Sequence, residues 1–192
     1  YRVTGGCHGN VRAEHCVVAD VYVSIVNKRQ AEIGIDMIAV PFKKDGGVDI
    51  DAIEGLVASD SSIKGIWCVP KYSNPTGVTY SDDVVTRLAK MDAAKDFRIF
   101  WDNAYSVHSI YGDDVLKNIF PECEKAGNPD RVYMFASTSK ITFSGAGVAT
   151  LISSEKNIEE YKSHLKYATI GPNKIVQLAH YRYCLLYTSD AA

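Results

Sequence analysis

The chain lacks a strong excess of charge, a long apolar run and a recognisable cysteine pattern. Its 192 residues carry a formal net charge of −2, which gives no electrostatic basis for binding nucleic acid or an anionic membrane. No apolar stretch approaches the length of about 20 residues that a membrane-spanning helix needs. The five cysteines are odd in number and form no CxxC pair, which is typical of a reducing compartment. We therefore expect a cytoplasmic protein.

Several other features are missing. No Gly/Ser linker, low-complexity tract or repeat interrupts the middle of the chain. Gly145 and Gly147 lack the GxGxxG pattern of a dinucleotide fingerprint. The metal-capable side chains near the N-terminus have a spacing that fits no zinc pattern, so we expect no metal site there: Cys7, His8, His15 and Cys16. What remains is ordinary globular material, 46% hydrophobic and 23% charged, in a chain long enough to bury one sizeable core.

The middle of the chain alternates between strand and helix patterns. Strands are expected at residues 34–40, 63–69, 98–101, 132–135 and 147–152. Helices are expected at 49–58, from Ser81 to about residue 91, at 155–167, and at 114–126 with a break near Pro121. Asp49 and Ser81 are typical helix N-caps, and Val84, Leu88 and Met91 recur at helical spacing and should face the sheet. This alternation predicts an α/β fold with a mainly parallel sheet covered by helices.

Polar motifs follow three of these strands. PKYSNPTG occupies residues 70–77, DNAY occupies 102–105, and STSK occupies 137–140. An open α/β sheet places ligands at the carboxyl ends of its strands, so these groups should converge there. They provide an amide, a carboxylate with a phenol, and an amine flanked by hydroxyls. This is the polar inventory needed to hold a phosphorylated pyridine aldehyde through an amine.

The ordered motifs PxxSNPTG, DNAY and SxSK resemble the signature of class I/II aminotransferases, the fold-type I enzymes that use pyridoxal phosphate. The chain is most similar to aspartate aminotransferase subgroup Ic, over residues 32–182. The resemblance implies a three-layer α/β architecture in which this chain is part of the large domain. It also implies a homodimer with amino acid and 2-oxo acid substrates, and no nucleic-acid or membrane partner.

The resemblance further implies a role for each motif residue. Lys140 is the catalytic residue and forms the Schiff base with the cofactor. Asp102 holds the pyridine nitrogen protonated, while Asn74 and Tyr105 bind the phenolic oxygen. Ser137 and Ser139 bind the phosphate, with backbone N–H groups assisting.

Each of these residues also has a simpler interpretation. A lysine after a strand is usually a solvated surface group, and aspartate and asparagine favour turns and caps. A tyrosine can be a core aromatic, and small serines permit tight turns. His108 is more typical of a structural histidine, and Lys71 and Tyr72 have no assignable role. The chain departs from the broader family because no arginine follows Lys140 before Arg182, and SGAG stands at 144–147 instead.

We expect three segments. Residues 1–30 match no landmark of the family and are interpreted as spurious or divergent sequence, 31–183 as part of the cofactor-binding large domain, and 184–192 as an adapter-derived tail. The function expected by resemblance is an aminotransferase that uses aspartate or a similar donor. Two alternatives remain: a lyase or decarboxylase on the same scaffold, and the cofactor-sensing domain of a transcription regulator. With the small domain missing, the chain by itself should be inactive.

Overall fold

The computed structural model describes residues 14–18, 35–40, 42–45, 47–74, 76–110, 112, 115–143 and 145–189. They form one six-stranded sheet in the order β2-β1-β3-β4-β5-β6. The strands are β1 (Glu14–Val18), β2 (Ile35–Ala39), β3 (Ile63–Cys68), β4 (Arg98–Asp102), β5 (Val132–Ser137) and β6 (Ala149–Ile152). Neighbouring strands from β2 to β5 are parallel, and β6 runs antiparallel to β5. The predicted mainly parallel sheet is confirmed.

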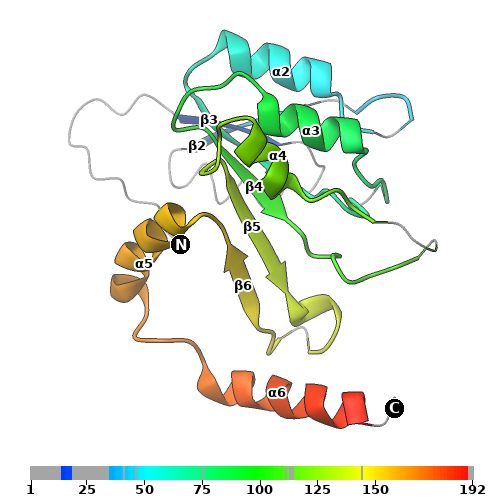
Figure 1. Cartoon of the computed structure of the whole chain (residues 1–192), viewed down its shortest axis with the longest axis vertical. Coiled ribbons are helices and arrows are strands. Elements are labelled where there is room, and N and C mark those ends of the chain that lie inside the picture. The colour runs from blue at the N-terminus through cyan, green and yellow to red at the C-terminus, as the bar shows by residue number, and fades with distance from the viewer. Residues whose placement is uncertain are drawn as a thin grey trace.

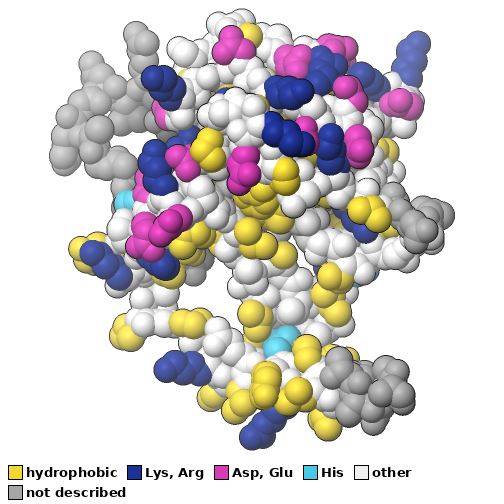
Figure 2. Space-filling view, in the orientation of Figure 1, with side chains coloured by type: hydrophobic (Ala, Val, Ile, Leu, Met, Phe, Trp, Pro, Cys, Tyr) yellow, Lys and Arg dark blue, Asp and Glu magenta, His cyan; other side chains and the backbone are white. Residues whose placement is uncertain are grey.

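Helices flank this sheet (Figure 1). They are α2 (Ile50–Ser59), α3 (Asp82–Lys90), α4 (Ile119–Lys125), α5 (Glu155–Ala168) and α6 (Lys174–Ser189), with a short 3-10 helix, η1, at Thr138–Lys140. Helices α2, α3 and α4 gather on the same side of the sheet, whereas α5 and α6 follow β6 at the other end of the molecule. Charged side chains cover the outer surfaces of α2 and α3, and apolar side chains are frequent along α6 (Figure 2).

Local sequence signals set the helix starts. The Asp49 side chain accepts a hydrogen bond from the Ala52 N–H at 3.2 Å, and Ser81 accepts one from the Val84 N–H at 3.3 Å. Both predicted N-caps are therefore confirmed, since each satisfies a backbone donor that the helix itself cannot.

The predicted helix at 114–126 is wrong in its extent. Asn118 caps α4 by accepting from the Phe120 N–H at 3.1 Å, and the helix begins only at Ile119. Pro121 does not break it, because Pro121 lies in the first turn, where a backbone N–H has no helical partner. Residues 115–118 are irregular, and Asp114 lies outside the described residues.

The core lies between the sheet and helices α2–α4. Ile66, Ile99 and Trp101 are fully buried on this face of the sheet. On α3 the buried residues are Val85, Leu88 and Ala89, whereas Val84 is only partly buried. Val84 packs against the edge of the core, while the fully buried i, i+3, i+4 stripe of α3 begins one residue later, at Val85.

The opposite face of the sheet carries a row of aromatic rings. Phe100 stacks on Trp67, Tyr133 and Phe135, with ring centroids 5.9, 6.0 and 6.4 Å away. All four rings are only partly buried. Since side chains alternate along a strand, Asp102 lies on this aromatic face, two residues beyond Phe100.

Two parts of the chain fold in ways that the sequence did not indicate. Strand β1, from within residues 1–30, lies between β2 and β3 and pairs with both. Residues 174–189 form α6, which extends into the proposed adapter-derived tail. The assignment of the three segments remains a prediction.

Among the described residues, no helix has the length and apolar content to cross a membrane. That part of the chain also contains no group of three or more histidine, cysteine, aspartate or glutamate side chains able to hold a metal. The side chains of Cys7, His8, His15 and Cys16 lie outside it.

Candidate active site

The three polar motifs lie at one edge of the sheet. Strands β3, β4 and β5 are adjacent and parallel, and their registers pair Cys68 with Trp101 and Asp102 with Phe135. The segments that follow these strands therefore leave the sheet at the same end. They carry Asn74, then Asp102 with Tyr105, then the Ser137–Lys140 turn.

Asp102 is the most informative ionisable group of this edge. Burial raises the pKa of its carboxyl above the usual range, while a hydrogen bond from the Ala104 N–H and the nearby Lys140 charge act in the opposite direction. Asp102 is thus a partly buried carboxylate. Among the described residues, Lys140 is the one cation that lowers its pKa. A second cation held against Asp102 would lower this raised pKa and offset the cost of burying the charge.

Asn74 lies on a loop that is closed by its own backbone. The Tyr80 N–H donates to the Pro70 carbonyl at 2.8 Å, and the Ser73 N–H donates to the Val78 carbonyl at 2.9 Å. Gly77 has a φ of 73°, which glycine adopts without strain. Asn74 is half-buried on this loop. Pro75 lies outside the described residues.

Tyr105 lies on a turn that follows β4. The Ser106 N–H donates to the Asn103 carbonyl at 3.2 Å, and the His108 N–H donates to the Tyr105 carbonyl at 3.1 Å. The rings of Tyr105 and His108 meet edge to face, with centroids 5.6 Å apart. His108 therefore contacts a predicted site residue rather than standing apart from it.

The Ser137–Lys140 turn carries the hydroxyls and the amine. The Ser137 hydroxyl accepts from the Ser139 N–H at 3.4 Å. A Cβ added to Gly147 would lie only 2.8 Å from the Ser139 Oγ. Gly147 therefore leaves room for the Ser139 hydroxyl, which gives this one glycine of the predicted glycine-rich stretch a physical role. Lys140 ends the turn, and its side chain is exposed, so the burial expected of a catalytic amine is absent in this chain.

His180, which the sequence did not indicate, supports this turn. Its Nε2 lies 3.0 Å from the Thr138 hydroxyl and 2.7 Å from the Thr142 hydroxyl, and its Nδ1 lies 2.9 Å from the Val176 carbonyl. A carbonyl can only accept, so Nδ1 carries the proton and Nε2 can accept from the hydroxyls. No sequence signal pairs residues about 40 positions apart, so only the fold reveals this contact.

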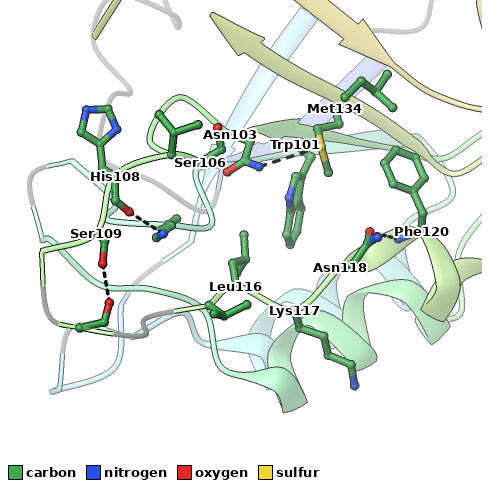
Figure 3. A pocket seen from close by; sticks show the side chains of 15 residues that line it. Trp101, Asn103, Ser106, His108, Ser109, Leu116, Lys117, Asn118, Phe120 and Met134 are labelled. Atoms are coloured by element: carbon green, nitrogen blue, oxygen red, sulfur yellow. Dashed lines mark hydrogen bonds between the residues drawn. The ribbon is translucent and has the colours of Figure 1, made fainter. Parts of the chain in front are cut away.

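A cavity of about 660 Å³ lies on the other side of β4 (Figure 3). Trp101, Asn103 and Met134 line it, and the Asn103 amide reaches the Met134 sulfur at 4.0 Å. None of the six predicted site residues lines this cavity. Alternation along β4 thus separates the cavity from Asp102.

Comparisons with known proteins identify the family of the chain. A family model described as aspartate amino-transferase matches residues 20–189. A Mycolicibacterium smegmatis protein named as an aminotransferase is 55% identical over 152 residues, which are 78% of this chain and 35% of that protein. An aspartate aminotransferase of Corynebacterium glutamicum is 48% identical over 158 residues, with the same two shares.

Solved structures give the same result for the fold. The chain superposes on an aspartate transaminase from Corynebacterium glutamicum with a TM-score of 0.81 and 42% identity, covering 91% of this chain and 41% of that one. It also matches an α-aminoadipate aminotransferase from Thermus thermophilus with a TM-score of 0.76, over 93% of this chain and 45% of that one. At 21% identity the second likeness shows the fold alone. The chain spans about a third of the length of the curated relatives, and it belongs to the aspartate aminotransferase family.

Proposed function

We propose that the protein containing this chain is a pyridoxal-phosphate-dependent aminotransferase that moves an amino group from aspartate, or a similar donor, to a 2-oxo acid. The observation that carries this proposal is that Asp102 and Lys140 lie at the same end of the adjacent strands β4 and β5. A partly buried carboxylate with a raised pKa there lies within electrostatic reach of an amine. The relatives at 48% and 55% identity, both named as aminotransferases, support it.

The residues of the edge fit the cofactor. Asp102 would hold the protonated pyridine nitrogen, the second cation that its burial calls for. Asn74 and Tyr105 would bind the phenolic oxygen, and Ser137 and Ser139 the phosphate. Gly147 leaves room for the Ser139 hydroxyl, which would donate to a phosphate oxygen. Lys140 would provide the covalent anchor.

When bound, pyridoxal phosphate supplies an electron sink for the substrate α-carbon. The chain's own residues supply the proton chemistry. Lys140 Nζ would act as the base for the proton on that carbon. Asp102 would keep the ring nitrogen charged, because a carboxylate that is shielded from water stabilises a cation strongly.

The complete protein is proposed to be a cytoplasmic homodimer, and this chain alone is proposed to be inactive. Exposed apolar side chains support a larger assembly, since a contiguous apolar surface marks a contact region. On α6, before the proposed adapter-derived tail, these residues are Ile175, Leu178 and Tyr181. Isolated chain that transferred amino groups from aspartate to 2-oxoglutarate above a no-enzyme control would contradict the inactivity.

Borohydride reduction of the cofactor-loaded, full-length protein tests the site. Reduction fixes the cofactor to its lysine, and peptide mapping then identifies the labelled residue. We expect the label on Lys140, and we expect Lys140→Ala to bind the cofactor without covalent attachment. Lys71 and Lys174 are internal controls on the same chain. A label on either of them would show that the active site is assigned wrongly.

A donor panel tests the substrate. Aspartate carries a second carboxylate that needs its own cationic partner. An apolar donor would leave that partner unpaired, and an unpaired group of this kind makes an enzyme discriminate strongly against such a donor. We expect aspartate to exceed alanine, tyrosine and branched-chain donors in kcat/KM. A higher value for alanine or tyrosine would reject aspartate as the donor. Release of ammonia or carbon dioxide in place of amino transfer would favour the lyase or decarboxylase, and cofactor binding without turnover would favour the regulator.

A further inference from the structure

Two residues that precede Asn74 grip the turn that carries Tyr105. The Lys71 Nζ donates a hydrogen bond to the His108 carbonyl at 2.6 Å. The Tyr72 hydroxyl accepts one from the Ile110 N–H at 2.9 Å. Both side chains are buried, with 6% of Lys71 and 8% of Tyr72 exposed. We call Lys71 and Tyr72, with these two hydrogen bonds, the loop clamp.

The clamp is built from unfavourable parts. A buried ammonium loses its hydration, and a backbone carbonyl replaces water only in part. Tyr72 has a φ of 48°, in the left-handed region that an aromatic residue rarely adopts. Backbone of this kind persists only where the surrounding structure holds it, and such positions cluster at functional sites.

The clamp connects the loop that carries Asn74 with the turn that carries Tyr105. On one side, Asn74 lies two residues after Tyr72, in the loop that the Pro70–Tyr80 and Ser73–Val78 backbone bonds close. On the other side, the clamped residue His108 packs its ring against that of Tyr105. The geometry therefore fixes the Asn74 loop relative to the Tyr105 phenol.

We propose that Lys71 and Tyr72 are positioning residues that hold the Tyr105 turn against the Asn74 loop, so that the Tyr105 phenol reaches the cofactor oxygen that Asn74 also binds. The proposal rests on the proposed function, in which both groups donate to the phenolic oxygen. Two donors reduce the negative charge on that oxygen. With one donor displaced, the charge grows and holds the proton on the neighbouring lysine–cofactor nitrogen more tightly, so the pH midpoint of the visible absorption band rises.

The test uses the full-length protein and Tyr72→Phe, which removes the hydroxyl and keeps the ring. Tyr161→Phe, which changes a tyrosine on the surface of α5, is the matched control. We expect Tyr72→Phe to raise the midpoint in the same direction as Tyr105→Phe, but less. Cofactor affinity should fall about 2- to 10-fold, as for the loss of one ordinary hydrogen bond. In the cofactor-free protein, amide exchange of the Ile110 peptide should become faster.

The double variant gives the decisive result. If the clamp acts through Tyr105, Tyr72→Phe should add nothing to the midpoint shift of Tyr105→Phe, because coupled residues are not additive. A full additional shift would overturn the proposal, as would an unchanged midpoint in both Tyr72→Phe and Lys71→Met. Should Tyr72→Phe fail to fold, Lys71→Met, with Lys174→Met as its control, repeats the same measurements.

Failure of the clamp is distinguishable from failure of the proposed function. If only the clamp is wrong, the borohydride label stays on Lys140 and Tyr105→Phe still raises the midpoint. If Tyr105→Phe leaves the midpoint unchanged, the role proposed for Tyr105 is wrong and the clamp proposal fails with it.

Discussion

Replacing Gly147 by alanine should weaken cofactor binding while leaving the fold intact. The new Cβ would lie 2.8 Å from the Ser139 Oγ, closer than such atoms approach in folded proteins, and 3.4 Å from the Ser139 N and the Thr138 Oγ1. Only the first contact forces a movement, and it involves a side chain with one rotatable bond. The Ser139 hydroxyl should therefore rotate away, at little cost to folding.

The loss of affinity follows from the bond that the hydroxyl would make. A hydrogen bond to a charged group contributes about 1.5–3 kcal/mol. Losing one bond to the phosphate should therefore raise the Kd for pyridoxal phosphate roughly 10- to 150-fold. Gly145→Ala is the matched control, because an added Cβ at Gly145 meets nothing within 4 Å.

The assay is titration of cofactor-free, full-length protein with pyridoxal phosphate, followed by absorbance, together with the melting temperature of each cofactor-free variant. Ser139→Ala should show the same loss as Gly147→Ala, and combining them should add little. Unchanged affinity in Gly147→Ala would refute the reasoning. Equal losses in Gly147→Ala and Gly145→Ala would refute it too, as would a large fall in the melting temperature of Gly147→Ala alone.

Two further substitutions test the Asp102 carboxylate and the hydrogen bonds that Asn157 of α5 makes. Burial raises the pKa of Asp102, so the folded protein holds this proton more tightly than the unfolded one, and ionisation costs stability as pH rises. Asp102→Asn should thus stabilise the cofactor-free protein more at about pH 8 than at about pH 4. The rate of the cofactor-loaded enzyme should fall about 10²- to 10³-fold. Equal effects on the free energy of urea unfolding at both pH values would contradict the expected pH dependence. Asn157 is fully buried and donates to the Asp130 carbonyl and the Ser153 hydroxyl, each at 2.8 Å; Asn157→Ala should lower the free energy of unfolding by about 1–3 kcal/mol, and a loss below about 0.5 kcal/mol would show that water replaces these bonds.

Local signals in the sequence predicted what local interactions decide. Asp49 and Ser81 each satisfy a donor three residues away, so their helices begin where the residue types indicate. The strand exits were predictable because apolar runs end at polar motifs. The predicted break at Pro121 was wrong because proline disrupts the interior of a helix but is tolerated in its first turn.

Contacts between distant residues could not be predicted in the same way. Lys71 meets His108, 37 positions away, and His180 meets Thr138, 42 positions away. Each contact depends on how loops are brought together after the sheet has formed. The burial of Lys71 could not be predicted either, since lysine is almost never fully buried unless it is paired.

Side chains alternate between the two faces of the sheet along β4, so the number of residues in this strand decides which side chains face the candidate site. Trp101 is completely buried against the helices, and Asp102 emerges on the aromatic face. Inserting or deleting one residue within β4 would exchange the two faces, turning a carboxylate into the core and an indole towards the aromatic face. Among related sequences, length variation should therefore collect between β4 and α4, while β4 keeps a constant number of residues.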